Sequence, residues 1–204
     1  LVSIVIPSKD NFEILRICTE SIKIKTRHNK YEVIIVDNGS SFETKEKIEA
    51  YAKESGFCYL YMPMEFNYSA MCNAGADRAE GNYLLFLNDD MEIVDEEYMD
   101  KLLAHAKRPH AGAVGAKLLY PSSEIIQHVG ITNLNCGPSH KLSTFSDEKE
   151  YYFGRNRRSY NVLAVTGACM MVDREKYFQV GGFSDKMEIC YNDVDLCISL
   201  YEKG

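Results

Sequence analysis

The order of the predicted elements in the first half of the chain limits the fold more than any other feature. Four short apolar runs predict β-strands at residues 1–6, 31–36, 57–62 and 83–87. Helical patterns fall between them: one follows Asp10-Asn11, which can cap it, one covers residues 41–55, and one begins at Asn67 or Ser69 and ends at about Ala79. A β-α-β-α-β-α-β order predicts parallel strands joined by right-handed crossovers. We therefore expect an α/β fold with a parallel central sheet.

The second half of the chain has a weaker pattern. Residues 97–107 predict a helix, and residues 113–119 and 162–172 are strand-like runs. Residues 121–160 predict a loop-rich segment with short strands, which could form a flap over a site. Asp173 is expected to cap a short helix, and Asn192 to open the last one. We expect a single domain over residues 1–204.

Composition and charge exclude several classes of protein. The 204 residues are 46% hydrophobic and 26% charged, which is ordinary for a globular domain. The net charge of −7 argues against a nucleic-acid partner. No apolar run approaches the ~20 residues that cross a bilayer. The seven scattered cysteines predict a reducing, cytoplasmic compartment. Because both ends fall inside predicted elements, we expect the chain to be a fragment of a longer protein.

Two neighbouring carboxylates follow the apolar run at 83–87. The run stops at Asn88-Asp89-Asp90, and in open α/β sheets ligands bind at the carboxyl ends of the strands. Carboxylate oxygens are ligands that Mg²⁺ and Mn²⁺ prefer, and these ions often also hold substrate phosphates. We expect a metal–diphosphate site at Asp89 and Asp90. A solvated acidic turn leading into the helix near Asp95 is an equally weighted alternative.

Other polar residues near element ends are weaker candidates. Asp37 ends the second strand and could bind ribose or base groups of a nucleotide, or only start the next helix through a local turn. Asp193 could be a general base, or an acid that stabilises the start of the last helix. Asn73 could contact a phosphate or the metal's surroundings, although an exposed helix position is the simpler interpretation. The basic cluster 155–158 could neutralise a diphosphate, or be a solvated loop.

Taken together, the motifs resemble a known family. Val2–Pro7, Val33–Ser40, Phe66–Gly75 and Gly81–Asp90 follow one another in the order of the family-2 inverting glycosyltransferases with the GT-A fold. Thr166–Val172, Gly181–Phe183 and Asn192–Cys197 extend the resemblance to the end of the chain. It is most similar to bacterial enzymes that build rhamnose-containing or O-antigen polysaccharides. The resemblance implies a Rossmann-like, mixed and mainly parallel central sheet flanked by helices.

The resemblance also implies roles for individual residues. Residues 1–95 would bind the nucleotide and residues 96–204 the acceptor. Asp193 matches the catalytic base, and Asp90, with Asp89, matches the ligands of a Mn²⁺ or Mg²⁺ ion. The implied nucleotide-binding residues are Pro7, Lys9, Asp37, Asn38, Asn73, Asn88 and Asp89. The implied acceptor-binding residues are Thr166, Gly167 and Asn192.

Two positions depart from the family pattern. Asn88 replaces the first Asp of the metal motif, which leaves less negative charge for the ion, and Asn192 replaces the Glu that precedes the base. The second change puts acceptor binding, or even activity, in question.

The implied reaction moves a sugar from a UDP- or dTDP-linked donor to a saccharide or lipid-linked acceptor. It would occur in the cytoplasm or at the inner face of the membrane. A catalytically decayed nucleotide-sugar-binding domain is an alternative, and a sugar-phosphate nucleotidyltransferase is another. A nucleotidyltransferase would need a Gly-rich, basic loop after the first strand, and Ser8-Lys9-Asp10-Asn11 does not supply one.

Overall fold

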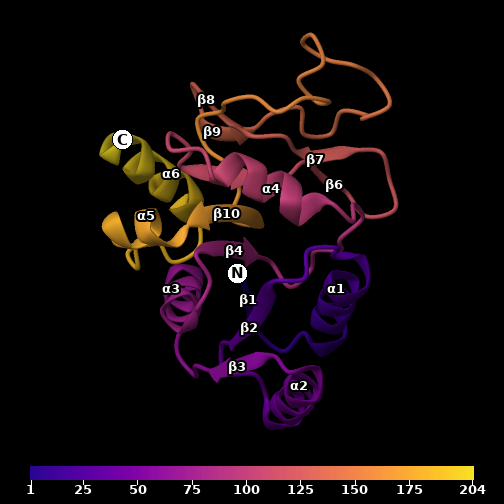
Figure 1. Cartoon of the computed structure of the whole chain (residues 1–204), viewed down its shortest axis with the longest axis vertical. Helices are drawn as coiled ribbons and strands as arrows, with labels where there is room; N and C mark the ends of the chain where they lie inside the picture. The colour runs from indigo at the N-terminus through magenta and orange to yellow at the C-terminus, as the bar shows by residue number, and fades with distance from the viewer.

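The protein is built around one six-stranded sheet. A computed structural model describes residues 1–204, and the order of strands across this sheet is β3-β2-β1-β4-β10-β5 (Figure 1). The bounds of these strands are β1 (Val2–Ser8), β2 (Tyr31–Asp37), β3 (Cys58–Tyr61), β4 (Tyr83–Leu87), β5 (Ala113–Gly115) and β10 (Cys169–Asp173). The first four strands pair in parallel, as the sequence predicts, whereas β10 is antiparallel to both of its neighbours.

Helices cover both faces of the sheet, which is therefore buried on both sides. One apolar core lies between the sheet and the helices α1, α2 and α4, and a second lies between the sheet and α3, α5 and α6. Figure 1 shows these two groups on opposite sides of the strands. The helices are α1 (Phe12–Lys25), α2 (Phe42–Ser55), α3 (Tyr68–Arg78), α4 (Tyr98–Ala106), α5 (Arg174–Gln179) and α6 (Asn192–Lys203). No helix combines the length and the apolar character needed to cross a membrane.

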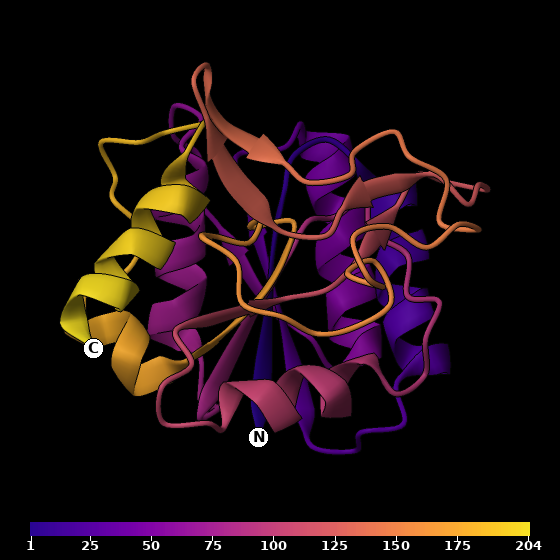
Figure 2. The ribbon, with the colours of Figure 1, turned by 90° about the horizontal axis from the view of Figure 1, so that it is seen from above.

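The segment between β5 and β10 forms a separate layer beyond the sheet. It contains two antiparallel pairs, β6 (Leu118–Leu119) with β7 (Ile126–His128) and β8 (Ile131–Leu134) with β9 (Gly137–His140). Figure 2 shows this layer lying across one end of the helices and strands. The prediction of a loop-rich segment with short strands is confirmed for residues 121–160.

The structure corrects two strand predictions. The run 113–119 is split between β5 and β6, which lie in different sheets, and only residues 169–173 of the second run form a strand. Apolar runs predict that a segment is buried. Their periodicity does not predict where a strand leaves a sheet or in which direction it runs.

Helix capping differs at one end from the expectation. Asn67 caps α3 and Asp173 caps α5 through side-chain hydrogen bonds, as predicted. Asn11 precedes α1 but its side-chain oxygen accepts no capping hydrogen bond; its amide nitrogen donates to Asp89. The Asp10 carboxylate accepts a hydrogen bond from the Ser41 N–H at the start of α2, so it caps a different helix from the one that follows it.

Close packing of α3 against the sheet depends on Gly75. A Cβ at this position would overlap Cγ1 of Val5 and lie 3.2 Å from Cγ2 of Val36. We expect Gly75→Ala to lower the free energy of unfolding by about 1–3 kcal/mol, the usual cost of overpacking, measured by urea denaturation. The same substitution should cost less in a Val5→Ala background, where the Val5 methyl groups are gone and only the wider contact with Val36 remains. An equal cost in both backgrounds would contradict this explanation.

Candidate active site

The carboxyl ends of three parallel strands bring the predicted donor-side residues together. Ser8 at the end of β1 is paired in register with Asp37 at the end of β2. The Ser8 hydroxyl also donates a hydrogen bond of 2.6 Å to Oδ2 of Asp89, which follows β4. Asp37 and the Asn88–Asp90 motif therefore share one edge of the sheet, as the parallel order of β1, β2 and β4 requires.

Asp89 is held in place by the first strand and helix. Besides Ser8, the Asn11 amide donates to the same carboxylate oxygen over 3.3 Å. Burial raises the pKa of the Asp89 carboxyl, and the negative charge of Asp90 adds to this effect. A nearby cation would offset this cost of keeping two adjacent carboxylates ionised.

The donor set at this edge suits a hard divalent ion. Asp90 is exposed, and Asp89 has one carboxylate oxygen free of contacts to side chains. The structure contains no group of three or more His, Cys, Asp or Glu side chains arranged to hold a metal. Mg²⁺ is often bound by one or two carboxylates together with water and substrate phosphates, so two adjacent carboxylates fit such an ion.

The predicted nucleotide-binding residues of β1 and β2 differ in how much they are exposed. Asp37 is fully buried, and its carboxylate accepts hydrogen bonds from the Tyr59 hydroxyl (2.5 Å) and the Ser40 N–H (2.8 Å). Asn38 is buried and donates to two carbonyls of residues 62 and 64, whereas its Oδ1 has no partner within the chain. Pro7 is buried within β1, and Lys9 is exposed just after it.

The predicted base lies close to the metal motif in space although it is far away in sequence. Asp193 is in the first turn of α6, and its Oδ2 accepts a hydrogen bond of 3.1 Å from the Gly167 N–H. Gly167 lies in the loop that leads into β10, where the Asn88 N–H donates to the Ala168 carbonyl. The Tyr68 hydroxyl lies 3.2 Å from Oδ1 of Asn88 and 3.1 Å from the Gly167 carbonyl. One continuous set of contacts thus joins the Asn88–Asp90 motif to Asp193.

Two predicted acceptor-binding residues make contacts that shape the same region. Asn192 is 5% exposed; its Oδ1 accepts from the Asp193 N–H, and its amide donates to the Met187 carbonyl. Thr166 is 8% exposed, and its hydroxyl accepts from the Ala168 N–H. Both side chains therefore make hydrogen bonds to the backbone near Asp193.

Asn73 has a structural role that the sequence did not reveal. Its amide nitrogen donates to the Phe183 carbonyl and to Asp185, and its oxygen accepts from the Tyr177 hydroxyl and the Phe183 N–H. All of its hydrogen-bonding groups are used, so its contacts do not support the prediction that it binds a nucleotide. The basic cluster is also tied to its own loop, because Arg157 donates to the Asp147 carbonyl and Arg155 stacks on Tyr160.

Buried His128 supports the loop that holds Gly167. Its Nε2 accepts hydrogen bonds from the Gly130 N–H (3.1 Å) and the Thr166 N–H (3.4 Å), which requires an uncharged ring. Burial lowers the pKa of His128 to about 3, and the nearby His140 contributes to the shift. His128 therefore remains neutral in the folded protein over the whole physiological range.

This low pKa predicts a loss of stability in acid. The unfolded chain binds a proton at His128 near pH 6.5, and the folded protein does so only near pH 3. Between these values the unfolded state holds more protons, so stability falls as the pH falls, by up to about 1.4 kcal/mol per pH unit. Urea denaturation from pH 7 to pH 4 should show this slope, and His128→Gln should reduce it. The control His110→Gln, at an exposed position, should leave it unchanged; an unchanged slope in His128→Gln would refute the assignment.

Sequence reasoning missed several residues that build this site. Tyr68, Ser8, Asn11 and Tyr59 each contact a predicted site residue, as described above. A signal for Tyr68 was present: it begins a helix directly after a strand of the parallel sheet, so its first turn must lie at the ligand-binding edge. Tyr59 gave no such signal, because only the parallel pairing of β3 with β2 brings it next to Asp37.

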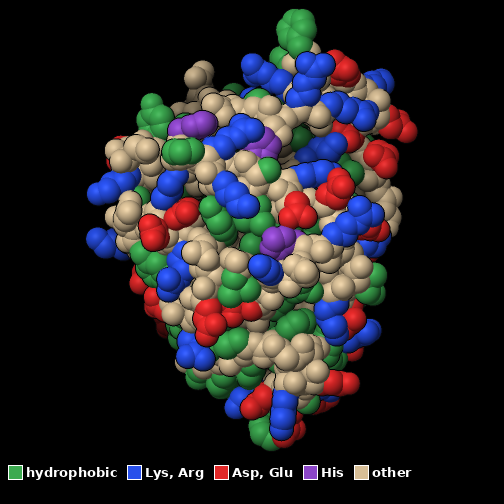
Figure 3. Space-filling model, in the orientation of Figure 1, with side chains coloured by type: hydrophobic (Ala, Val, Ile, Leu, Met, Phe, Trp, Pro, Cys, Tyr) green, Lys and Arg blue, Asp and Glu red, His purple; other side chains and the backbone are tan.

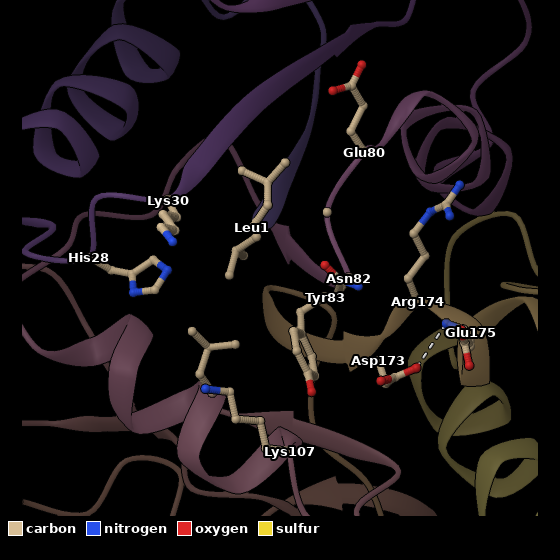
Figure 4. A pocket seen from close by; sticks show the side chains of 13 residues that line it. Leu1, His28, Lys30, Glu80, Asn82, Tyr83, Lys107, Asp173, Arg174 and Glu175 are labelled. Carbon is tan, nitrogen blue, oxygen red and sulfur yellow. Dashed lines mark hydrogen bonds between the residues drawn. The ribbon is translucent and has the colours of Figure 1, made fainter.

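A cavity lies at the opposite edge of the sheet. It has a volume of about 520 Å³ and lies at the start of β1 and β4, where its lining includes Lys30, Lys107, Tyr83 and Arg174 (Figure 4). None of the predicted site residues lines it. We place the site at the other edge because the motif carboxylates, the base and the carboxyl ends of the parallel strands all meet there. The surface in Figure 3 mixes acidic and basic side chains, which agrees with the absence of a strong basic character in the sequence.

Solved structures with this architecture define the class of the fold. The chain superimposes on a mannosyltransferase from Pyrobaculum calidifontis, solved in complex with GDP-Man and Mn²⁺, with a TM-score of 0.71 and 13% sequence identity. The match covers 98% of this chain and 51% of that one. Staphylococcus aureus TarS matches with a TM-score of 0.63 and 15% identity over 98% of this chain and 33% of TarS. The domain therefore has the GT-A fold.

Sequence comparison then gives the family. The pattern of glycosyl transferase family 2 matches residues 3–181, and the chain belongs to this family. It is 37% identical over 208 residues to the O-antigen biosynthesis protein RfbC of Myxococcus xanthus, and 35% identical over 210 residues to the uncharacterized protein y4gI of Sinorhizobium fredii. Both matches cover 100% of this chain, but only 16% and 23% of the two relatives. The chain thus spans less than a quarter of either relative.

Proposed function

We propose that this domain transfers a sugar from a nucleotide-diphosphate sugar to a hydroxyl group of a saccharide or lipid-linked acceptor, with inversion at the anomeric carbon. The contact between Asp193 and the Gly167 loop, which lies against the Asn88–Asp90 motif, carries this proposal. This contact supports the proposal because it links a carboxylate that could accept a proton to the motif whose carboxylate pair could hold a metal-bound diphosphate. Such a pairing is needed when a nucleophile is activated close to a phosphorylated leaving group.

On the donor side, the ends of β1 and β2 would hold the nucleoside. Lys9 is exposed at this edge, and Asn38 offers a buried oxygen without a partner, which an N–H of a base could satisfy. Asp37 would act by keeping this pocket in shape, because its carboxylate is already bonded to Tyr59 and Ser40. Asp90 and Asp89 would hold Mn²⁺ or Mg²⁺, which when bound neutralises charge on the leaving diphosphate.

On the acceptor side, Asp193 would act as the general base. It takes the proton of the acceptor hydroxyl while that oxygen forms a bond to the anomeric carbon. The bond between this carbon and the diphosphate oxygen breaks on the opposite face, and the nucleoside diphosphate leaves with the electron pair. The Gly167 N–H orients the carboxylate, and Asn192 supports it through the backbone of Asp193.

The biological setting proposed is bacterial surface polysaccharide synthesis. Its support is the 37% identity to RfbC, which is described as an O-antigen biosynthesis protein. We propose that the domain works in the cytoplasm or at the inner face of the membrane.

Calorimetric titration of UDP, dTDP and GDP, each with and without Mn²⁺, tests the donor side. We expect one nucleotide to bind more tightly with Mn²⁺ present; dTDP would favour a rhamnose donor, and GDP is included because the Pyrobaculum enzyme was solved with GDP-Man. Absence of binding for all three would contradict a working donor site in this domain.

Product analysis separates the remaining alternatives. Release of a nucleoside diphosphate from a nucleotide sugar is expected for a transferase, either with an acceptor or by slow hydrolysis. Release of pyrophosphate from a nucleoside triphosphate and a sugar phosphate would instead show a nucleotidyltransferase. Nucleotide binding without any turnover, when an acceptor pool is supplied, would favour the decayed binding domain that Asn192 left open.

A further inference from the structure

The first turn of α3 contacts the segment that leads to the predicted base. The Tyr68 N–H donates to the Glu188 carbonyl, the Asn67 amide to the Asp185 carbonyl, and the Ser69 hydroxyl to the Met187 carbonyl. These three consecutive residues thus fix residues 185–188, only a few positions before Asp193. α3 belongs to the nucleotide-binding half, so it anchors the other half of the site to the donor side.

Tyr68 adds a side-chain contact to both sides of the site. Its hydroxyl lies within hydrogen-bonding distance of Oδ1 of Asn88 in the metal motif and of the Gly167 carbonyl. Gly167 in turn donates its N–H to Asp193. Burial raises the pKa of the Tyr68 phenol well above its usual value, so the group stays protonated and can donate. The ring packs edge-on against Phe183, which fixes its position.

The Tyr68 hydroxyl has one proton but lies near two acceptors, Asn88 and the Gly167 carbonyl. Asn88 can resolve this shortage because its amide can also donate a hydrogen bond. A phenol donates one hydrogen bond and can accept others. If the Asn88 amide turns its NH₂ group to Tyr68, the phenol accepts from Asn88 and donates to the Gly167 carbonyl, so both contacts are satisfied. The orientation of an Asn amide is assigned from its hydrogen bonds, and this network favours that one. An aspartate at position 88 could only accept.

We propose that Tyr68 is a positioning residue that fixes Asp193 relative to the metal motif by holding Gly167, and that Asn88 is suited to this role because it can donate to the phenol. Its role in turnover rests on the proposed function. The geometric part, that the Tyr68 hydroxyl holds Gly167 against Asp193, stands on the contacts alone.

The test compares Tyr68→Phe with Tyr177→Phe. Tyr177 is a fully buried tyrosine whose hydroxyl donates to Asn73, away from Gly167, so its variant also loses one buried hydroxyl. Hydrogen exchange of the Gly167 amide, followed by NMR, reports on the contact to Asp193. We expect Tyr68→Phe to speed this exchange about three- to tenfold, the effect of losing one hydrogen bond. Tyr177→Phe should leave the exchange rate of the Gly167 amide within about twofold of the wild-type rate.

Kinetics provide the second measurement. Tyr68→Phe should lower kcat about three- to tenfold while the Kd for the nucleotide with Mn²⁺ stays within about twofold, because the donor contacts remain. If Tyr68 had only a structural role, Tyr68→Phe and Tyr177→Phe would both change thermal stability. Tyr68→Phe would then not lower kcat while leaving the Kd for the nucleotide unchanged. Equal Gly167 exchange in Tyr68→Phe and wild type would overturn the proposal.

Asn88→Asp gives an independent variant at the other end of the contact. It restores the more common residue of the metal motif, so it would be expected to help a purely metal-binding role. We expect it instead to speed exchange at Gly167, because the phenol must then donate to the carboxylate and release the carbonyl. Unchanged exchange would refute the role given to Asn88. If wild type bound no nucleotide, the proposed function would fail while the exchange comparison still decided the contact.

Discussion

Replacement of Asp193 by Asn is expected to lower kcat by about 10²–10⁴, the range that general acid–base catalysis contributes. Asn keeps the shape of the side chain, and its oxygen can still accept from the Gly167 N–H, so the fold and the loop should be retained. The amide cannot take a proton from an acceptor hydroxyl. The Kd for the nucleotide with Mn²⁺ should stay within about twofold, because the donor contacts lie on other elements.

A matched control is available in the same turn of α6. Asp195 is a partly exposed acid two residues further on, and Asp195→Asn removes the same charge. It should leave kcat within about threefold of wild type. Turnover by Asp193→Asn at the wild-type rate, or an equal loss in both variants, would contradict the assignment of the base. Rates should be measured with saturating donor and acceptor, so that a change in binding is not mistaken for a change in chemistry.

Asp90→Ala should abolish most of the effect of Mn²⁺ on nucleotide affinity. Loss even of a residue that only supports a metal ligand costs about 10–100-fold in metal affinity or activity, so loss of a direct ligand should cost at least about tenfold. The exposed position of Asp90 makes a large change in folding stability unexpected. Calorimetric titration with and without Mn²⁺ measures the effect directly.

Glu92→Ala serves as the control for this experiment. Glu92 is also an exposed acid, two residues after Asp90, so its loss changes the local charge equally. The dependence of nucleotide affinity on Mn²⁺ should persist in this variant. If Asp90→Ala bound the nucleotide as tightly as wild type, both with and without the ion, then Asp90 would not be a ligand. If Glu92→Ala had the same effect as Asp90→Ala, the contribution would be general charge and not coordination.

The edge of the sheet that holds Asp37 and the Asn88–Asp90 motif could be predicted from the sequence, because it follows from the parallel direction of the strands. Alternating strands and helices fix the direction of β1, β2 and β4, and their carboxyl ends must then share an edge. Asp37 and Asp89 meet there as expected, and Ser8 lies between them. The partners of these residues could not be predicted in the same way. Asn11 follows a helix-capping pattern in the sequence, yet its side chain bonds to Asp89, because the motif loop passes within reach in the folded chain.

The sequence by itself determined the parallel half of the sheet, the helix boundaries near Asn67 and Asp173, and the identity of the acidic motif. These follow from local periodicity, capping and strand ends, which depend on neighbouring residues. Only the tertiary structure decided that β10 runs antiparallel beside β4, that Asn73 braces the 183–185 turn, and that Tyr68 and Gly167 join Asn88 to Asp193. The contacts of Tyr68 with Gly167 and of Asn73 with Phe183 connect residues 99 and 110 positions apart. Their formation depends on how the two halves pack together, which no local pattern in the sequence predicts.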